Sequence, residues 1–183
     1  MTIDTGHADD LDACVALWIL ALTAREAAPP VVGTAERARG KLAHDPVSWR
    51  VLRDEQGSVC GFGLITAPAT GSPSDPPAAV YVSLLAIDPA LQGRGHGAAL
   101  LTELLADARK AGHATAVLHV LTSNVAATQL YLSTGWRAAG AAFAHPLSGL
   151  PSQTFILDLT EGVPRAAADA DATPPARLRL TRE

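Results

Sequence analysis

Apolar residues recur at two different spacings along the chain, and these spacings separate predicted helices from predicted strands. After Asp9 they recur every three or four residues, which predicts an amphipathic helix that the Pro29-Pro30 pair must end. A leucine-rich segment with the same spacing follows Gly97, and Gly112 stands where a left-handed cap would stop that helix. Two shorter helices are predicted at 34–43 and at about 124–134.

Short apolar runs between these helices predict strands. The run at 80–87 is almost uninterrupted, with Ser83 inside it, which favours a strand that is covered on both faces. A long loop at 67–77 is dense in Pro, Gly and Ser, and loops of that length are commonly functional or mobile. The other predicted strands are 49–52 and 59–66, joined by a hairpin turn at 54–57, then 115–121, 136–144 and 154–159.

The composition changes after Glu161. The following residues are rich in alanine and proline and show no usable period, which predicts a flexible C-terminal tail at 163–183. Residues 1–162 are then predicted to form one domain. A chain of 183 residues is long enough for one sizeable core and too short for two catalytic domains.

Composition and charge exclude several classes of protein. Hydrophobic residues make up 48% of the chain and charged residues 17%, so disorder of the whole chain is excluded. The net charge of -4 argues against a nucleic-acid binder that relies on phosphate contacts. No apolar stretch reaches the length of a membrane span and no secretory signal is present, so we expect a cytoplasmic protein without a membrane partner. Cys14 and Cys60 form no C-x-x-C motif, and we expect neither a disulfide framework nor a metal.

A glycine-rich turn, Gln92-Gly93-Arg94-Gly95-His96-Gly97, separates a predicted strand from the leucine-rich helix. Its glycines let the backbone turn tightly, and the helix N-terminus adds unpaired N–H groups and the positive end of its dipole. Together these groups can bind a phosphate or pyrophosphate. The motif is neither a Walker loop nor a good dinucleotide-binding fingerprint, and alone it can also be a simple tight turn.

A second motif runs from Asn124 to Tyr131 and is followed by Gly135-Trp136. Asn124 and Tyr131 are seven positions apart, so they share one face of the short helix. The Tyr131 hydroxyl can then point toward whatever the glycine-rich turn holds. Taken singly, Asn124 can also be a helix cap and Tyr131 a half-buried packing residue.

Taken together, residues 80–136 resemble the GNAT superfamily of acyl-CoA-dependent N-acetyltransferases. Leu85-Ala86-Ile87-Asp88-Pro89 and the glycine-rich turn are similar to the family's strand and pyrophosphate turn, Q/R-x-x-G-x-G/A. Residues 124–136 are similar to its segment N-x-x-A-x-x-L-Y-x-x-x-G-F/W. The resemblance covers about 3–160 in element order. It implies an α/β (α+β) fold, with a mixed, mostly antiparallel twisted sheet of six to seven strands, about four flanking helices, and a splayed central strand pair that holds acetyl-CoA.

The resemblance also implies a role for each residue of the two motifs. Backbone groups of 85–87 are expected to pair with the pantetheine arm, and backbone N–H groups of 92–98 to hold the pyrophosphate. Asn124 is expected to contact the pantetheine or the adjoining backbone. Tyr131 is expected near the thioester sulfur, as general acid for the departing thiolate. The expected cofactor-binding residues are Leu85, Ala86, Ile87, Gln92, Gly93, Arg94, Gly95, His96, Gly97, Ala98, Asn124 and Tyr131, of which the Arg94 and His96 side chains either add charge near the phosphates or face water.

The motifs leave the general base open. An alkylamine must lose a proton before it attacks, since its pKa lies near 10.4, so the site needs a base or a water relay. Many family members have Glu on the central strand where this chain has Ser83, which can hold a water but is not a base by itself. His119 on the next strand is a candidate because an ordinary imidazole suits base work, although it can also be a packed histidine. The candidate catalytic residues are Tyr131, Ser83 and His119, with Tyr81 and His145 as weaker candidates.

We therefore expect an acetyl-CoA-dependent N-acetyltransferase that acts on a primary amine, of a small molecule, by direct attack. A second hypothesis is a protein N-terminal or lysine acetyltransferase, and a third is a sensor that binds acyl-CoA without turnover. The expected partners are acetyl-CoA and an amine acceptor, and the protein is expected to be a monomer or a homodimer. The sequence does not identify the amine.

Overall fold

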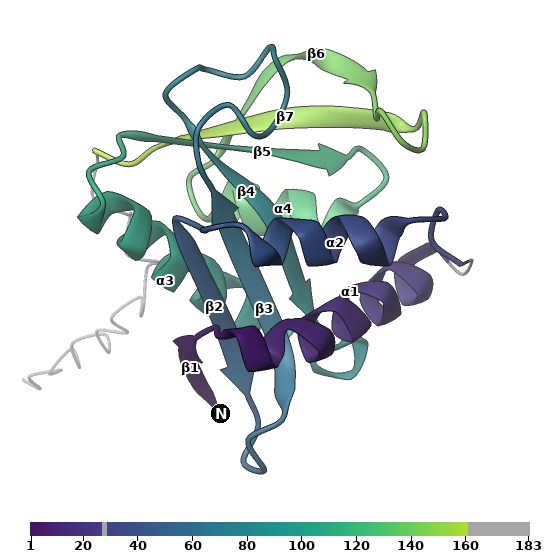
Figure 1. Ribbon diagram of the computed structural model, residues 1–183. Coiled ribbons are helices and arrows are strands. Elements are labelled where there is room, and N and C mark those ends of the chain that lie inside the picture. The colour runs from purple at the N-terminus through teal and green to yellow at the C-terminus, as the bar shows by residue number, and fades with distance from the viewer. Residues whose placement is uncertain (27–28, 161–183) are drawn as a thin grey trace, which may run out of the picture.

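Seven strands form a single mixed sheet with helices on both faces in the computed structural model, which describes residues 1–26 and 29–160 (Figure 1). The strand order is β1-β2-β3-β4-β5-β7-β6, and the β4–β5 pairing is parallel while the others are antiparallel. This confirms the predicted fold class. The strands are β1 (Thr2–Thr5), β2 (Ser48–Arg53), β3 (Val59–Thr66), β4 (Val80–Ile87), β5 (Thr115–Leu121), β6 (Arg137–Ala144) and β7 (Pro151–Asp158).

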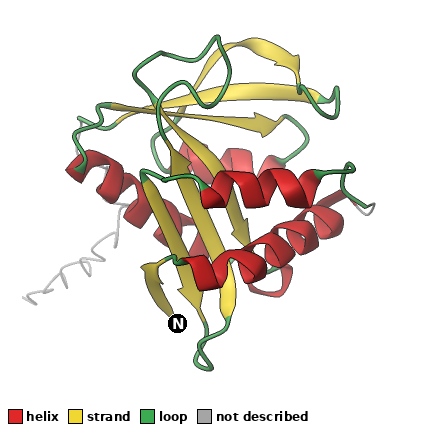
Figure 2. Ribbon diagram, viewed as in Figure 1, coloured by secondary structure: helices red, strands yellow, loops and turns green. Residues whose placement is uncertain are grey.

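Four α-helices cover the two faces of the sheet (Figure 2). They are α1 (Leu11–Glu26), α2 (Thr34–Ala43), α3 (His96–Lys110) and α4 (Val125–Ser133), accompanied by two short 3-10 helices, η1 (Ala8–Asp10) and η2 (Pro89–Leu91). Helices α1 and α2 pack on β2, β3 and β4 from one side, while α3 and α4 pack on the other. None of the helices in the described ranges is long and apolar enough to cross a membrane.

The apolar face predicted for the helix after Gly97 is confirmed. Its four leucines, Leu100, Leu101, Leu104 and Leu105, are all buried, none more than 3% exposed. Burial of a leucine side chain stabilises the fold by about 1.5–3 kcal/mol, so this face fixes α3 firmly against the sheet. The N-terminus of α3, which carries the glycine-rich turn, is therefore held at a defined place beside β4.

Several predicted boundaries shift for physical reasons. The first α-helix begins at Leu11 instead of Asp9, because Asp10 ends a 3-10 turn and accepts a hydrogen bond from the His7 backbone N–H at 3.0 Å. The last strand begins at Pro151 instead of Thr154, since it pairs with both β5 and β6 from there on. The short strand β1 was not predicted, and it exists through its pairing with β2. The predicted tail at 163–183 lies outside the described residues.

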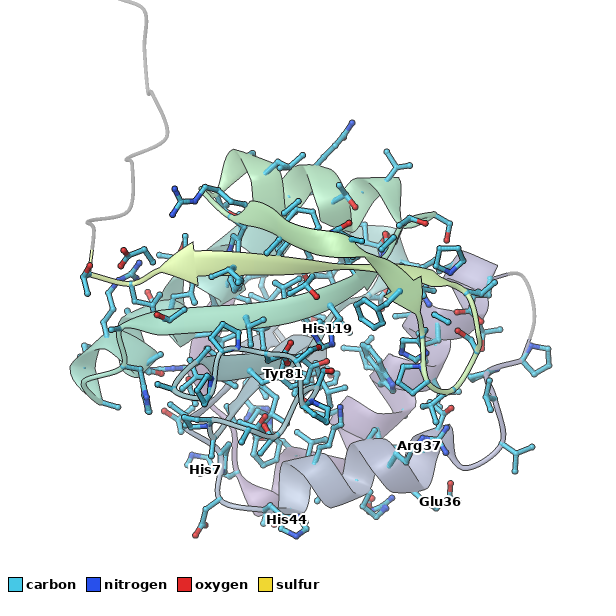
Figure 3. All side chains as sticks on the ribbon, turned by 90° about the horizontal axis from the view of Figure 1, so that it is seen from above. His7, Glu36, Arg37, His44, Tyr81 and His119 are labelled. Carbon is cyan, nitrogen blue, oxygen red and sulfur yellow. The ribbon has the colours of Figure 1, made fainter. Side chains whose placement is uncertain are left out.

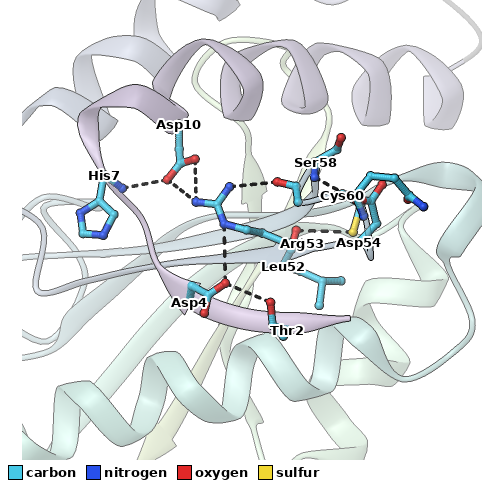
Figure 4. Close-up of polar contacts among 11 residues, drawn as sticks. Thr2, Asp4, His7, Asp10, Leu52, Arg53, Asp54, Ser58 and Cys60 are labelled. Carbon is cyan, nitrogen blue, oxygen red and sulfur yellow. Dashed lines mark hydrogen bonds and ion pairs between the residues drawn. The ribbon is translucent and has the colours of Figure 1, made fainter.

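A network of ion pairs joins the N-terminal segment to the sheet (Figure 4). Arg53 at the end of β2 donates to both carboxylate oxygens of Asp10, at 2.8 and 2.9 Å, and its Nε lies 3.6 Å from Asp4. Asp10 is buried, so its negative charge needs this partner. The network sets the position of α1, which in turn covers the face of the sheet on which α2 lies.

An irregularity in β4 decides which residues of this strand face which helices. Leu64 of β3 is opposite Leu84, but the next residue of β3, Ile65, is opposite Val82, so Ser83 has no partner on β3. Such a β-bulge reverses the alternation of side chains. Val82 consequently packs in the core with α3, while Leu84 packs in the core with α1.

Candidate active site

Strands β4 and β5 separate soon after they begin. Their register contains two pairs, Val80 with Ala116 and Tyr81 with Val117, and from Val82 onward β4 has no strand partner on that side. Residues 85–87, expected to bind pantetheine, lie in this unpaired part of β4. The separation leaves backbone groups of a central strand available to a ligand, which is unusual for the middle of a sheet.

The glycine-rich turn leads directly into α3 at the same end of β4. Gly93 and Gly95 have φ of 75° and 82°, the left-handed region that favours glycine, and Gly95 is the N-cap of the helix. No backbone N–H from 92 to 98 donates to a protein acceptor in the described part of the chain. A Cβ at either glycine would meet no atom within 4 Å, so the turn is open to a ligand. Arg94 is exposed, His96 and Ala98 are partly exposed, and the Gln92 amide nitrogen donates to the Ile87 carbonyl at 3.1 Å.

Ser83 lies at the bulge of β4, where the strands separate. Its hydroxyl is buried and has no hydrogen-bond partner among the described residues. A buried hydroxyl without a partner is destabilising, and such groups usually await a water or a ligand. The bulge therefore presents a polar group at the point where the two strands separate.

Tyr131 on α4 is 8% exposed and packs against aromatic rings on the far side of the separation. Its ring centroid lies 5.8 Å from that of Trp136 and 6.1 Å from that of Phe155. Its hydroxyl makes no hydrogen bond to any residue that the structure describes. Burial, with a smaller contribution from nearby Tyr81, raises the pKa of Tyr131 well above its ordinary value. The phenol is therefore protonated at neutral pH and can donate a proton or a hydrogen bond.

Asn124 is the N-cap of α4. Its side-chain oxygen accepts a hydrogen bond from the Ala127 backbone N–H at 3.2 Å. This is the capping role that the sequence left open, and it fixes the helix that carries Tyr131. The amide nitrogen of Asn124 makes no hydrogen bond within the described ranges, so capping leaves it available to a ligand.

His119 on β5 forms an ion pair or hydrogen bond that sequence reasoning missed. Its Nε2 lies 2.8 Å from Oδ1 of Asp75, and the two side chains are 11% and 5% exposed. Asp75 comes from the long loop between β3 and β4, and its other oxygen accepts from the Ser72 backbone N–H at 2.7 Å. In the neutral tautomer that carries its proton on Nε2, this nitrogen donates to the carboxylate and Nδ1 has the free lone pair.

Two aromatic rings enclose the His119 imidazole. Its ring centroid lies 5.3 Å from that of Tyr81 on β4 and 5.1 Å from that of Phe143 on β6. Tyr81 and His119 lie close together in the side-chain view (Figure 3). Burial, then the charge of Asp75, raises the pKa of Tyr81 to about 12. Asp75 is the single acidic residue of the 67–77 loop. This isolated charge is the feature of the sequence that could have identified Asp75 as a candidate site residue.

Cationic side chains lie on the α2 side of this group. Lys41 of α2 places its ammonium nitrogen 5.6 Å from the centroid of the Tyr81 ring. Burial and then the charge of Arg37 lower the pKa of Lys41. Burial and then the positive charges of His119, Arg25 and Lys41 lower the pKa of His145, outweighing Glu26, which raises it. The structure thus brings His119 and Tyr81 together and adds Asp75 and Lys41, while Ser83 lies two residues after Tyr81 on the same strand. His145 is near enough for the charges of His119 and Lys41 to affect its pKa.

The cysteines take no part in this region. Cys14 and Cys60 are both buried and free, and burial raises the pKa of Cys14 to about 12. Thiols held in the protonated form are poor nucleophiles. Within the described ranges, no group of three or more His, Cys, Asp or Glu side chains is placed to hold a metal ion.

Comparison with known proteins places this geometry in a family. The sequence pattern of the Acetyltransferase (GNAT) family matches residues 17–136. A mycothiol acetyltransferase of Propionibacterium freudenreichii subsp. shermanii is 33% identical over 142 residues, which are 74% of this chain and 43% of that protein. The chain thus spans less than half the length of this relative.

Solved structures share the fold. The ribosomal-protein-S18-alanine N-acetyltransferase of Escherichia coli superposes with a TM-score of 0.68 at 22% identity, over 94% of this chain and 98% of that one. The yncA protein of Salmonella typhimurium, solved with its cofactor acetyl-CoA, gives a TM-score of 0.66 at 25% identity, over 93% and 98%. These structures confirm the fold predicted from the sequence, and the family match confirms the predicted class, the GNAT acetyltransferases. The chain belongs to the GNAT family of acetyltransferases.

Proposed function

We propose that the protein transfers the acetyl group of acetyl-CoA to a primary amine of a small molecule, with His119 as general base and Tyr131 as general acid. The observation that carries this proposal is the His119–Asp75 pair beside the separation of β4 and β5. Acetyl-CoA supplies an activated acyl group in a thioester. Everything else the reaction requires is binding, orientation and proton movement by the chain itself.

The residues present fit acetyl-CoA. The unpaired edge of β4 at 85–87 offers backbone groups to the amides of a pantetheine arm. The unpaired N–H groups of 92–98 and the N-terminus of α3 suit a pyrophosphate. Gly93 and Gly95 allow close approach to the backbone, while the free amide nitrogen of Asn124 suits a further contact with the pantetheine.

His119 is the proposed base because its free nitrogen and its partner suit proton abstraction. Nδ1 keeps a lone pair, and the imidazolium that forms is stabilised by the Asp75 carboxylate. Asp75 acts through His119 and is a positioning residue. Proton abstraction by a placed base contributes about a hundred- to ten-thousandfold to the rate.

Tyr131 and Ser83 are proposed to interact with the departing thiolate and with the attacking amine. Tyr131 is held protonated by burial, so its hydroxyl can donate to the departing thiolate. The Ser83 hydroxyl lacks a partner and suits a hydrogen bond to the attacking amine or to a water beside it. A backbone N–H near Leu85 suits the developing negative charge on the carbonyl oxygen.

Support for a small acceptor comes from the curated relative, which is named for mycothiol. The structural neighbour named for an alanine of ribosomal protein S18 is 22% identical and supports the fold alone. A protein acceptor is therefore the second hypothesis, and an acyl-CoA sensor without turnover is the third. Retention of a buried tyrosine and a paired histidine beside the separated strands favours an active enzyme over a sensor.

The test measures thiol release from acetyl-CoA with a panel of small primary amines and with peptides. His119→Gln is expected to lower kcat on the best amine by about a hundred- to ten-thousandfold. Asp75→Asn is expected to lower kcat by about tenfold or more without a change in KM for acetyl-CoA, and Asp75→Glu to restore part of the loss. His44→Gln, which changes an exposed histidine at the end of α2, is the matched control.

The outcomes separate the three hypotheses. Turnover with peptides but not with small amines would favour the protein acceptor. Acetyl-CoA binding without thiol release from any acceptor would favour the sensor. A folded His119→Gln protein with the kcat of His44→Gln would rule out His119 as the base.

A further inference from the structure

Lys41 is a partly buried cation whose charge is not neutralised. Its ammonium lies over the Tyr81 ring and makes neither an ion pair nor a hydrogen bond with any residue that the structure describes. A cation over an aromatic face is stabilised less than one paired with a carboxylate when the pair is desolvated. Other cations of the fold do have carboxylate partners: Arg25 with Glu26, Arg39 with Asp12, Arg50 with Asp107, and Arg53 with Asp10.

Arg37 adds a second positive charge on the same helix, four residues before Lys41. Its guanidinium donates to the Val32 carbonyl at 3.2 Å and to the Thr34 hydroxyl at 2.9 Å, and within the described ranges it has no carboxylate partner. Like charges at this helical spacing repel each other. Their repulsion is relieved when an anion binds next to them, so the pair is arranged to attract one. This local positive charge is opposite in sign to the net charge of -4 of the whole chain.

These charges lie beside the proposed base. The Lys41 ammonium lies 5.6 Å from the centroid of the Tyr81 ring, and the centroid of the His119 imidazole lies 5.3 Å from the same point, so one small molecule can reach both. The side-chain view shows Arg37 on α2, on the same side of the sheet as Tyr81 and His119 (Figure 3). The charge on Lys41 also reaches His145 at the margin of this region. An acceptor with its amine at His119 therefore meets a positive environment on its α2 side.

We propose that the acceptor is a primary amine that also carries an acid group, as in an amino acid, and that Lys41 binds this acid with Arg37 in support. The inference rests on the proposed function and deepens it by naming the substrate class. The amine faces Nδ1 of His119 and the acid faces α2. A carboxylate at Lys41 forms an ion pair in which both the donor and the acceptor of the hydrogen bond are charged, whereas a neutral amide in its place accepts only a weaker hydrogen bond from the ammonium.

The test compares each of several amino acids with its own amide, so that the pair differs in the acid group alone. For each pair, the ratio of kcat/KM for the acid to that for the amide is measured in wild type and variants. Comparing this ratio between proteins cancels the difference in amine pKa between acid and amide. Lys41→Met keeps the aliphatic stem over Tyr81 and is expected to lower the ratio about ten- to a hundredfold. Lys41→Glu is expected to lower it further, because it adds repulsion of the acid.

Arg39→Met is the matched control, since Arg39 is an exposed cation on the same helix that pairs with Asp12. It is expected to keep the wild-type ratio. Equal losses on acid and amide in Lys41→Met, with an unchanged ratio, would make Lys41 a packing residue and overturn the inference while the proposed function stands. Should Lys41→Met not fold, Lys41→Gln takes its place in the same comparison. A wild-type protein that acetylates no amine at all would overturn both proposals.

Discussion

A single hydroxyl, that of Tyr131, illustrates how the site differs from a packed core. Its ring packs well against Trp136 and Phe155, and a phenylalanine would pack there equally well. The hydroxyl makes no hydrogen bond to any residue that the structure describes, so it adds no contact to this packing that a phenylalanine would lack. Stability therefore gives no reason for a tyrosine at this position, whereas proton donation does.

Tyr131→Phe is expected to lower kcat about ten- to a thousandfold while leaving acetyl-CoA affinity nearly unchanged. The hydroxyl acts only when negative charge builds on the sulfur, so its loss affects the transition state more than binding. The measurement is kcat by thiol release under conditions where chemistry limits the rate, together with acetyl-CoA affinity by calorimetry.

The same variant gives a second readout in its melting temperature. Because the hydroxyl has no partner to lose, the melting temperature of Tyr131→Phe is expected to equal or exceed that of wild type. A folded variant with unaltered kcat would exclude the acid role. If Tyr81→Phe lost kcat instead, the proton donor would be the tyrosine of β4.

At the scale of elements, most helices and strands could be predicted from the sequence because their apolar residues recur at a regular spacing. The segments 34–43, 59–66, 80–87 and 115–121 agree with the structure at both ends. The bulge at Ser83 could not be predicted, since it is a property of the register between two strands and not of either strand alone. The same holds for Asp75, whose loop has no periodicity and whose partner lies 44 residues away.

The glycine-rich turn offers a test at this scale, because α3 has a left-handed glycine near each end. Gly95 at its start and Gly112 beyond its end have φ of 82° and 86°, and a Cβ at either meets nothing within 4 Å. Valine at either position strains the backbone by a comparable amount, about 1–3 kcal/mol. Gly95→Val is expected to reduce acetyl-CoA affinity at least tenfold, while Gly112→Val keeps it, as measured by calorimetry.

Equal affinity in the two folded variants would remove the pyrophosphate assignment. Gly97 is a weaker test, although the motif predicts the same role for it. Its φ is not positive, and a Cβ there would lie 3.4 Å from a methyl carbon of Leu130. A substitution at this position therefore changes the packing between α3 and α4 as well as the turn.

At the scale of the whole molecule, one ion pair joins the last turns of α3 to the sheet. Arg50 of β2 donates twice to Asp107, at 2.7 Å each, and the Ser48 hydroxyl donates to the same carboxylate at 2.7 Å. These hydrogen bonds, that of Arg50 first, lower the pKa of Asp107 below its ordinary value of 3.8. The folded protein therefore stabilises the ionised Asp107 carboxylate more than it stabilises the protonated carboxyl group.

The sign of the pH dependence follows from that lowered pKa. The stabilisation by Asp107 is complete above its ordinary pKa and is lost as the pH falls through the lower, folded value. Asp107→Asn is expected to lower the free energy of unfolding by about 1–2 kcal/mol at pH 7, and the difference from wild type to shrink below about pH 4. Urea unfolding across this range measures it. Asp12→Asn, which changes an exposed ion pair, is the control and is expected to have almost no effect.

The separation of β4 and β5 has a further consequence for the molecule as a whole. Two registered residue pairs join the half of the sheet formed by β1–β4 to the half formed by β5–β7, so interstrand hydrogen bonds contribute little to holding the halves together. A ligand that binds between them adds the contacts that the folded chain lacks. By linkage, a ligand at a hundred times its dissociation constant raises the free energy of unfolding by about 2.7 kcal/mol. The lifetime of the protein against heat and proteolysis is then coupled to the supply of acyl donor, and an enzyme starved of acetyl-CoA is also the enzyme most readily degraded.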